Sequence, residues 1–235
     1  MTRLGFVTGL RREAAILEAA SRGLPEEARP LICCGGAHTE RAGTGALRLV
    51  EAGAGALISF GIAGGLAPSL ASGSLVLASA VQVPGKASFD VEPAWRERLC
   101  RRLSAAMTPQ LGEVVGSHRV VQSVDDKARL YGETLGLAVD MESHAVAQVA
   151  RERALPFLVV RAVADTASMP IPSPALHGVG PRGEMRPFAV LGRAVFAPSE
   201  WPALLRLSGA HQKALGALRD VVRIAGIDLA FEQRN

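Results

Sequence analysis

The sequence predicts an α/β protein, in which buried strands alternate with amphipathic helices. The chain opens with an apolar run at residues 4–8, a glycine at position 9 and helical spacing of apolar residues over 11–20. A strand, a glycine turn and a helix in this order are typical of α/β domains. The run at 157–164 is almost entirely apolar, as expected of a strand covered on both faces. No linker interrupts the first 167 residues, so we expect a single domain over residues 1–235.

The segments between these two strands follow the same alternation. Apolar runs predict strands, helical spacing of apolar residues predicts helices, and glycines separate many of them. In chain order we expect strands at residues 31–34, 56–60, 74–81, 116–122 and 137–140, and helices at 41–52, 95–107, 126–135 and 142–153.

The character of the sequence changes after Asp165. Five of the 14 prolines and three glycines lie between Ser168 and Pro187, which predicts an irregular insertion over residues 168–200. Helical periodicity then returns over residues 201–224. One face of this C-terminal helix is expected to carry Trp201, Leu204, Leu205, Leu215, Leu218 and Val222.

The composition excludes several classes of protein. Hydrophobic residues make up 49% and charged residues 20% of the chain, which argues against disorder. Aromatic residues are only 4%, too few for a platform that stacks single-stranded nucleic acid. The net charge is +4, but the 23 arginines and three lysines are scattered. We therefore interpret them as a solvated surface and expect no nucleic-acid partner.

The cysteines and histidines predict neither disulfides nor a metal site. Three cysteines, with Cys33 and Cys34 adjacent and no CxxC, indicate a cytoplasmic protein with reduced thiols. The five histidines are isolated, so we expect no metal, and for His144 a packing or capping role. The uncharged stretch 52–85 is long enough to cross a bilayer, but its glycines favour strand, turn and strand instead.

Four acidic or glycine-rich features follow expected strands. They are Glu13, the segment 61–65, the pair Asp140 and Glu142, and Asp165. Open α/β sheets bind ligands at the carboxyl ends of their strands, so this placement favours a common site. A carboxylate at a helix start is also often a favourable dipole placement, and each feature taken singly allows that simpler interpretation.

Together these features resemble the nucleoside phosphorylase/nucleosidase superfamily. The resemblance covers residues 4–167 and is similar in order and spacing to its methylthioadenosine nucleosidase branch. It implies a three-layer αβα sandwich around a central mixed twisted sheet. The motifs are TGLRRE at 8–13, GIAGGLAPSLASG at 61–73, VDMES at 139–143 and VRAVAD at 160–165.

The last third of the chain is similar to the bacterial hopanoid-associated phosphorylases, which are held to remove adenine from adenosylhopane, a lipid nucleoside. That resemblance rests on AVDMESH at 138–144, the proline-rich loop and WPALLRL at 201–207. It implies a nucleoside with a lipid tail as substrate. Apolar residues interspersed with arginine over 169–207 suit contact with an anionic membrane, while an ordinary surface loop and core helix remain the alternative.

The superfamily resemblance also implies roles for individual residues. Asp165 would be the acid at purine N7, and Glu13 the carboxylate that activates water. Glu142 would bind the ribose hydroxyls, and Met141 would pack on the sugar. Family members often carry a serine before the acid to orient it, where this chain has Ala164.

The glycine segment implies further contacts with substrate. Gly61, Ile62 and Gly64 would bind substrate, with Gly65 helping the backbone to approach the ligand. The stretch 121–126 carries no aromatic residue, although relatives stack one on the base there, so no stacking residue is assigned.

The identity of the nucleophile depends on other positions. Phosphorylases of the superfamily place Arg where this chain has Ser59, and Ser where it has Ile62, which together with Glu13 favours hydrolysis. We expect no cofactor, although inorganic phosphate remains an alternative co-substrate. The arginines that are expected near helix starts and could bind an anion are Arg11, Arg12, Arg41 and Arg48.

Two other functions stay open. The first is a nucleosidase for small soluble substrates such as methylthioadenosine and adenosylhomocysteine, which would share every catalytic residue. The second is a nucleoside-binding α/β protein without activity, which the joint presence of Glu13, Glu142 and Asp165 disfavours. The resemblance also implies a homodimer or larger homo-oligomer.

Overall fold

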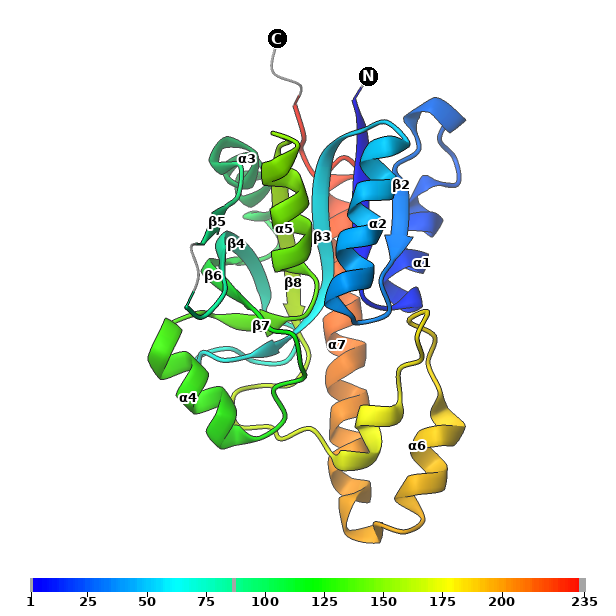
Figure 1. Cartoon of the computed structure of the whole chain (residues 1–235), viewed down its shortest axis with the longest axis vertical. Coiled ribbons are helices and arrows are strands. Elements are labelled where there is room, and N and C mark those ends of the chain that lie inside the picture. The colour runs from blue at the N-terminus through cyan, green and yellow to red at the C-terminus, as the bar shows by residue number, and fades with distance from the viewer. Residues whose placement is uncertain (1, 86–87, 233–235) are drawn as a thin grey trace.

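A single mixed sheet organises the chain in a computed structural model that describes residues 2–85 and 88–232. The sheet has eight strands in the order β2-β1-β3-β7-β6-β4-β5, and β8 pairs with both β3 and β4 (Figure 1). The strands are β1 (Arg3–Thr8), β2 (Leu31–Cys34), β3 (Ala54–Gly65), β4 (Leu75–Gln82), β5 (Phe89–Asp90), β6 (Gln110–Gly116), β7 (Ala138–Asp140) and β8 (Phe157–Val163).

Strand β3 is the centre of the sheet because it pairs along its whole length. Its first half lies parallel to β1, and Leu57–Ala63 lie parallel to β8. Its last two glycines then pair antiparallel with β7. Strands β1, β3 and β8 therefore end at the same edge, where the motif residues were expected to gather.

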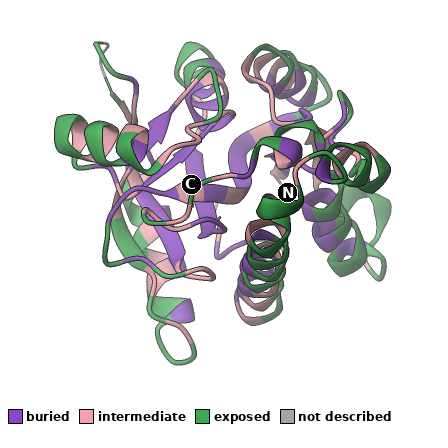
Figure 2. Cartoon of the chain, turned by 90° about the horizontal axis from the view of Figure 1, so that it is seen from below, coloured by how far each residue is buried: buried purple, intermediate pink, exposed green. Residues whose placement is uncertain are grey.

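Helices cover both faces of this sheet. One core joins α1, α3 and α7 to the sheet, and a second core on the other face joins α2 and α5 to it (Figure 1). Strands are largely buried and the outer sides of the helices are exposed (Figure 2). The expected three-layer αβα sandwich is confirmed. Its helices are α1 (Arg11–Ser21), α2 (Thr39–Glu51), α3 (Pro93–Leu103), α4 (Val124–Thr134), α5 (Ser143–Glu152), α6 (Pro187–Ala194) and α7 (Trp201–Ala225).

Three expected segments differ from the structure. The glycine segment 61–65 does not follow a strand but belongs to β3, because its backbone still pairs with β8 and β7. The strand expected at 116–122 ends at Gly116, where β6 meets the last residue of β7. The insertion is not wholly irregular, since it contains α6 with Pro187 in its first turn, where a proline is tolerated.

The C-terminal helix is buried over only part of its length. Its core face begins at Leu207, whereas Trp201 and Leu205 are exposed and were wrongly expected on that face. These first turns extend beyond the sheet and lie beside α6 (Figure 1). Among the described residues no helix is both long and apolar enough to span a membrane.

Candidate active site

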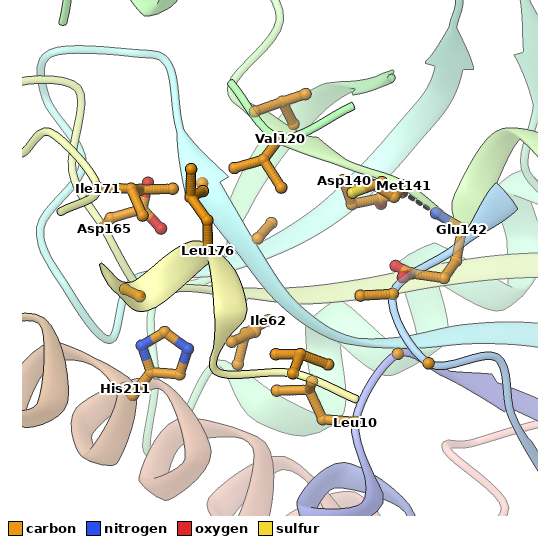
Figure 3. A pocket seen from close by; sticks show the side chains of 18 of the residues that line it. Leu10, Ile62, Val120, Asp140, Met141, Glu142, Asp165, Ile171, Leu176 and His211 are labelled. Atoms are coloured by element: carbon orange, nitrogen blue, oxygen red, sulfur yellow. Dashed lines mark hydrogen bonds between the residues drawn. The ribbon is translucent and has the colours of Figure 1, made fainter. Parts of the chain in front are cut away.

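A cavity of about 550 Å³ lies at the carboxyl ends of β1, β3, β7 and β8. Its floor comes from the motif residues, and the insertion and α7 close the other side. Figure 3 shows Asp165 and Glu142 at opposite ends of the cavity, with Ile62 and Leu176 between them. The sheet edge therefore brings together side chains that are up to about 150 residues apart in sequence.

Glu13 is a buried carboxylate that three backbone N–H groups hold in place. Its Oε2 accepts hydrogen bonds from the N–H groups of Gly9 and Leu10, both at 2.8 Å. Its Oε1 accepts one from Ile62, also at 2.8 Å. Burial raises the pKa of Glu13, while these N–H groups and the Arg161 charge oppose the shift. The carboxyl group is thus fixed, with Oε1 left one donor short of its capacity.

Arg161 is the buried cation around which the floor is built. Its Nε lies 2.8 Å from Oδ2 of Asp140, and one terminal nitrogen lies 3.4 Å from Oε2 of Glu142. The same nitrogen donates to the hydroxyls of Ser59 at 2.6 Å and Ser143 at 3.0 Å. Neighbouring carboxylates raise the pKa of Arg161, although burial opposes the shift. Phosphorylases were expected to carry an arginine where this chain has Ser59. Here the Ser59 hydroxyl instead accepts a hydrogen bond from the buried Arg161.

Glu142 shares this cluster but has an unusual acidity. Burial, together with the negative charges of Asp140 and Glu13, raises its pKa to about 8, although Arg161 pulls it down. Asp140 is committed elsewhere, since it accepts hydrogen bonds from the backbone N–H groups of Glu142 and Ser143 and so begins α5. The raised pKa favours the protonated form of Glu142, in which the carboxyl group can donate as well as accept a hydrogen bond.

Asp165, at the other end, has a separate cation of its own. The buried ammonium of Lys127 lies 2.5 Å from its Oδ2. His211 of α7 also lines the cavity; burial lowers its pKa, although Asp165 opposes the shift. The imidazole is therefore neutral at pH 7, and Nδ1 lies 3.2 Å from the carbonyl oxygen of Leu207.

The glycines near the cavity make room for protein side chains. A Cβ at Gly61 would lie 2.6 Å from Arg161 and 2.8 Å from Glu13, and one at Gly64 would lie 3.1 Å from Asp165. Gly61 does not line the cavity, whereas Ile62 and Gly64 do. Gly61 was expected to let the backbone approach a ligand. Instead, the missing side chain leaves space for the buried charged groups of Arg161 and Glu13.

Met141 lies between the two carboxylates that begin α5, and it lines the cavity. Its carbonyl oxygen accepts a hydrogen bond from the Thr39 hydroxyl at 2.9 Å, which ties this loop to the first turn of α2. Val120, Val121 and Ile171 line the cavity together with Arg119. Among the described lining residues none is Phe, Tyr or Trp, so the structure assigns no aromatic side chain that stacks on the base.

The structure separates the four arginines proposed to bind an anion. Arg41 alone among them lines the cavity, and it donates to the carbonyl oxygens of Gly35 and Gly36, both at 2.8 Å. Arg11 and Arg12 line other hollows, and Arg48 lies in the last turn of α2 and not near its start. They do not form a common anion site.

Hydrogen bonds hold the insertion to the rest of the chain on two sides. The N–H of Arg11 donates to the carbonyl oxygen of Gly183 at 3.0 Å, next to the turn that carries Glu13. On the opposite side, Ile171 and Gln122 exchange two hydrogen bonds of 2.9 and 3.0 Å. These contacts make the insertion a wall of the cavity.

Comparison with known proteins gives the family. The family model of the phosphorylase superfamily matches residues 19–195, more than half of the chain. The chain belongs to the phosphorylase superfamily.

Solved structures with the superfamily's fold extend over nearly the whole chain. The 5′-methylthioadenosine/S-adenosylhomocysteine nucleosidase of Neisseria meningitidis, in complex with methylthio-immucillin-A, has a TM-score of 0.73 and 18% identity, covering 98% of this chain and 100% of that one. The futalosine hydrolase of Helicobacter pylori has a TM-score of 0.71 and 14% identity, covering 94% and 96%. At these identities the likeness concerns the fold.

The two buried cations of the site, Arg161 and Lys127, were not predicted from the sequence, and neither was the lining residue His211. Arg161 is a lone charge in the otherwise apolar β8, and Lys127 is one of only three lysines in the chain. A charge within a buried strand must be paired, so Arg161 carried a usable signal. Lys127 lies in a polar helix and carried none, because its partner Asp165 is 38 residues away.

Proposed function

We propose that this protein cleaves the N-ribosidic bond of an adenine nucleoside and releases adenine. One observation carries the proposal: the carboxyl groups of Glu13, Glu142 and Asp165 line one cavity of about 550 Å³. Paired carboxyl groups divide acid and nucleophile work in glycoside cleavage generally. The membership of the phosphorylase superfamily and the fold of adenine nucleosidases support the same reaction.

In this mechanism the two ends of the cavity act on different parts of the substrate. Asp165 donates a proton to N7, so that the base leaves as a neutral species. Glu142 binds the ribose hydroxyls, and its proton allows it to act as donor. Met141, which precedes Glu142 and also lines the cavity, packs on the sugar.

We propose water as the nucleophile. The Oε1 atom of Glu13 has one backbone donor and can still accept a hydrogen bond from water. The arginines that line the cavity are Arg41, Arg119 and Arg186. Arg41 donates to two carbonyl oxygens and Arg186 pairs with Glu184, which favours water over phosphate. Phosphorolysis stays the alternative, with phosphate as co-substrate.

We further propose adenosylhopane as the substrate. The wall contributed by the insertion and α7 is mainly apolar, with Leu176, Val179, Pro181 and Leu207 on it beside Arg186 and His211. Such a wall suits a hydrocarbon substituent on the ribose, since burial of apolar surface is favourable by roughly 25 cal/mol per Å². The alternative substrates are methylthioadenosine and adenosylhomocysteine.

A substrate with a hopane tail requires access from a membrane, and α6 offers a surface for peripheral contact. Phe188 is 86% and Phe196 is 88% exposed, and Leu205 nearby on α7 is 70% exposed. Arg193 on α6 and Arg206, next to Leu205 on α7, are exposed, so anionic lipid would complement the surface. We propose that this apolar end of the molecule, here called the α6 surface, binds the cytoplasmic face of the membrane.

The experiment is an adenine-release assay with and without phosphate. The purified protein is incubated with adenosylhopane and, separately, with 5′-methylthioadenosine, and mass spectrometry identifies the sugar product. We expect adenine and a free anomeric hydroxyl, with a higher kcat/KM for adenosylhopane and no dependence on phosphate. A sugar 1-phosphate would establish phosphorolysis instead, and absence of adenine from both would contradict the proposed reaction. Light scattering of the same sample tests for the proposed homodimer or larger homo-oligomer.

A further inference from the structure

The helix α4 has a polar surface, yet it buries one charged side chain completely. Lys127 is the buried residue of this helix, and its side chain has no exposed surface. A buried ammonium is costly unless each of its hydrogens finds an acceptor. Its Nζ donates to Oδ2 of Asp165 at 2.5 Å and to the carbonyl oxygens of Thr166 and Met169, both at 2.8 Å. All three ammonium hydrogens are thus used on one segment.

This segment carries the proposed acid. Lys127 fixes the first residues after β8 through two carbonyl oxygens and fixes the Asp165 side chain through Oδ2. Ala164, the preceding residue, has no hydroxyl with which to orient the acid. The lysine therefore occupies one carboxyl oxygen and leaves Oδ1 to meet the base.

We propose that Lys127 is the positioning residue for departure of the base, an inference that rests on the proposed adenine release. In this step Asp165 carries a proton on Oδ1 while Oδ2 accepts the hydrogen bond from Lys127. As the C1′–N9 bond breaks, its electron pair passes to the base and N7 takes that proton. Water adds to C1′ and gives its proton to Glu13, so that adenine and a free sugar result. The carboxylate formed at Asp165 is stabilised by the Lys127 ammonium, which carries the opposite charge at 2.5 Å.

The first test compares two leaving groups in Lys127→Met, which removes the charge and keeps a side chain of similar length. Adenine leaves only when N7 is protonated, whereas p-nitrophenolate leaves without a proton. We expect kcat for 5′-methylthioadenosine, or for adenosylhopane if that alone is cleaved, to fall about 10-fold or more with KM nearly unchanged. Cleavage of p-nitrophenyl β-D-riboside should stay within about threefold of wild type.

Equal losses on both substrates would overturn the inference, because a general defect of the fold does not distinguish leaving groups. Lys213→Met, an exposed lysine on α7, is the matched control and should behave as wild type on both substrates. Wild-type protein that releases no adenine from either nucleoside would instead contradict the proposed function, and that result is visible before any variant is made.

A double-mutant cycle tests whether Lys127 acts through Asp165. It uses one adenine nucleoside and the variants Asp165→Asn, Lys127→Met and the double variant. The double variant removes both members of the buried pair and leaves neither without its partner, so it can fold even if a single variant cannot. We expect it to be no slower than Asp165→Asn. A double variant slower by the product of the single losses, or by a further factor of about 10 relative to Asp165→Asn, would show an independent role and overturn the inference.

Discussion

The floor and the insertion form opposite sides of the same cavity, but different interactions stabilise them. On the floor, buried charges hold one another: Arg161 pairs with two carboxylates, and backbone N–H groups hold Glu13. The insertion instead lines the cavity mainly with aliphatic side chains, and it exposes Phe188 on α6 and Phe196 just after α6 on its outer side.

The difference assigns separate tasks to the two walls. A buried charge cluster tolerates little change, because removal of one member leaves another buried and uncompensated. An apolar wall can change in shape without such a penalty, since its contacts are not directional. The floor is therefore suited to fix the reaction and the insertion to select the substrate. The predictions below test this division.

The largest effect is expected on the floor from Arg161→Met. The change leaves Asp140 buried without its counter-charge and removes the guanidinium that contacts Glu142, so we expect a loss of about 3–5 kcal/mol in the free energy of unfolding. Urea denaturation followed by circular dichroism measures it. Arg153→Met, an exposed arginine just after α5, is the control and should change stability by less than about 0.5 kcal/mol. A similarly small effect at Arg161 would mean that the cluster does not hold the floor.

The next effect is catalytic and concerns Glu13→Gln. The glutamine amide cannot accept a proton from water. Its NH₂ group would also point at a backbone N–H, so that two donors face each other where the carboxylate now accepts a hydrogen bond. We expect adenine release to fall about 100-fold or more, measured as kcat at saturating substrate. Glu18→Gln, on the exposed side of α1, should retain wild-type turnover. Near-normal turnover in Glu13→Gln would remove this residue from the mechanism.

The division also explains what could be predicted from sequence. Glu13, Glu142 and Asp165 were found because each follows a strand, and strand ends are visible in local patterns. Lys127 was missed because its pairing with Asp165 is tertiary and leaves no periodicity.

Two secondary-structure errors have a local cause. The helix α6 was missed because it lies in a segment rich in proline and glycine, although Pro187 occupies a position that tolerates proline. The strand placed at 116–122 was wrong because β6 begins earlier, at Gln110, within a half-polar run that pairs with β4 and β7.

A smaller effect on the floor is expected from the pKa of Glu142. That pKa is about 8 in the folded protein against an ordinary 4.5, so the folded protein keeps a proton that the unfolded chain releases. The free energy of unfolding of the wild type should therefore fall as pH rises from about 4.5 to 8.

The variant Glu142→Gln cannot release this proton. Between pH 5 and pH 8 the free energy of unfolding of the wild type should fall by at least about 1 kcal/mol relative to that of Glu142→Gln, measured by urea denaturation at each pH. Glu133→Gln, an exposed residue of α4, should follow the wild-type profile. If the free energies of unfolding of wild type and Glu142→Gln changed in parallel with pH, burial would not raise the pKa of Glu142.

The smallest effect on the chemistry should come from the outer side of the insertion, in the double variant Phe188→Ser/Phe196→Ser. Both rings are almost fully exposed and neither lines the cavity, so turnover of 5′-methylthioadenosine should stay within about twofold of wild type. Binding to vesicles that contain anionic lipid, measured by cosedimentation, should weaken about 10-fold or more, because two aromatic anchors are lost.

Wild-type binding should also weaken with added salt, since arginines contribute to it. Leu111→Ser, an exposed apolar residue on β6 and outside the α6 surface, should change neither quantity. If the wild type binds no vesicles, or if the phenylalanine variant loses turnover of the soluble substrate as well, the insertion belongs to the catalytic framework and the two walls do not have separate tasks.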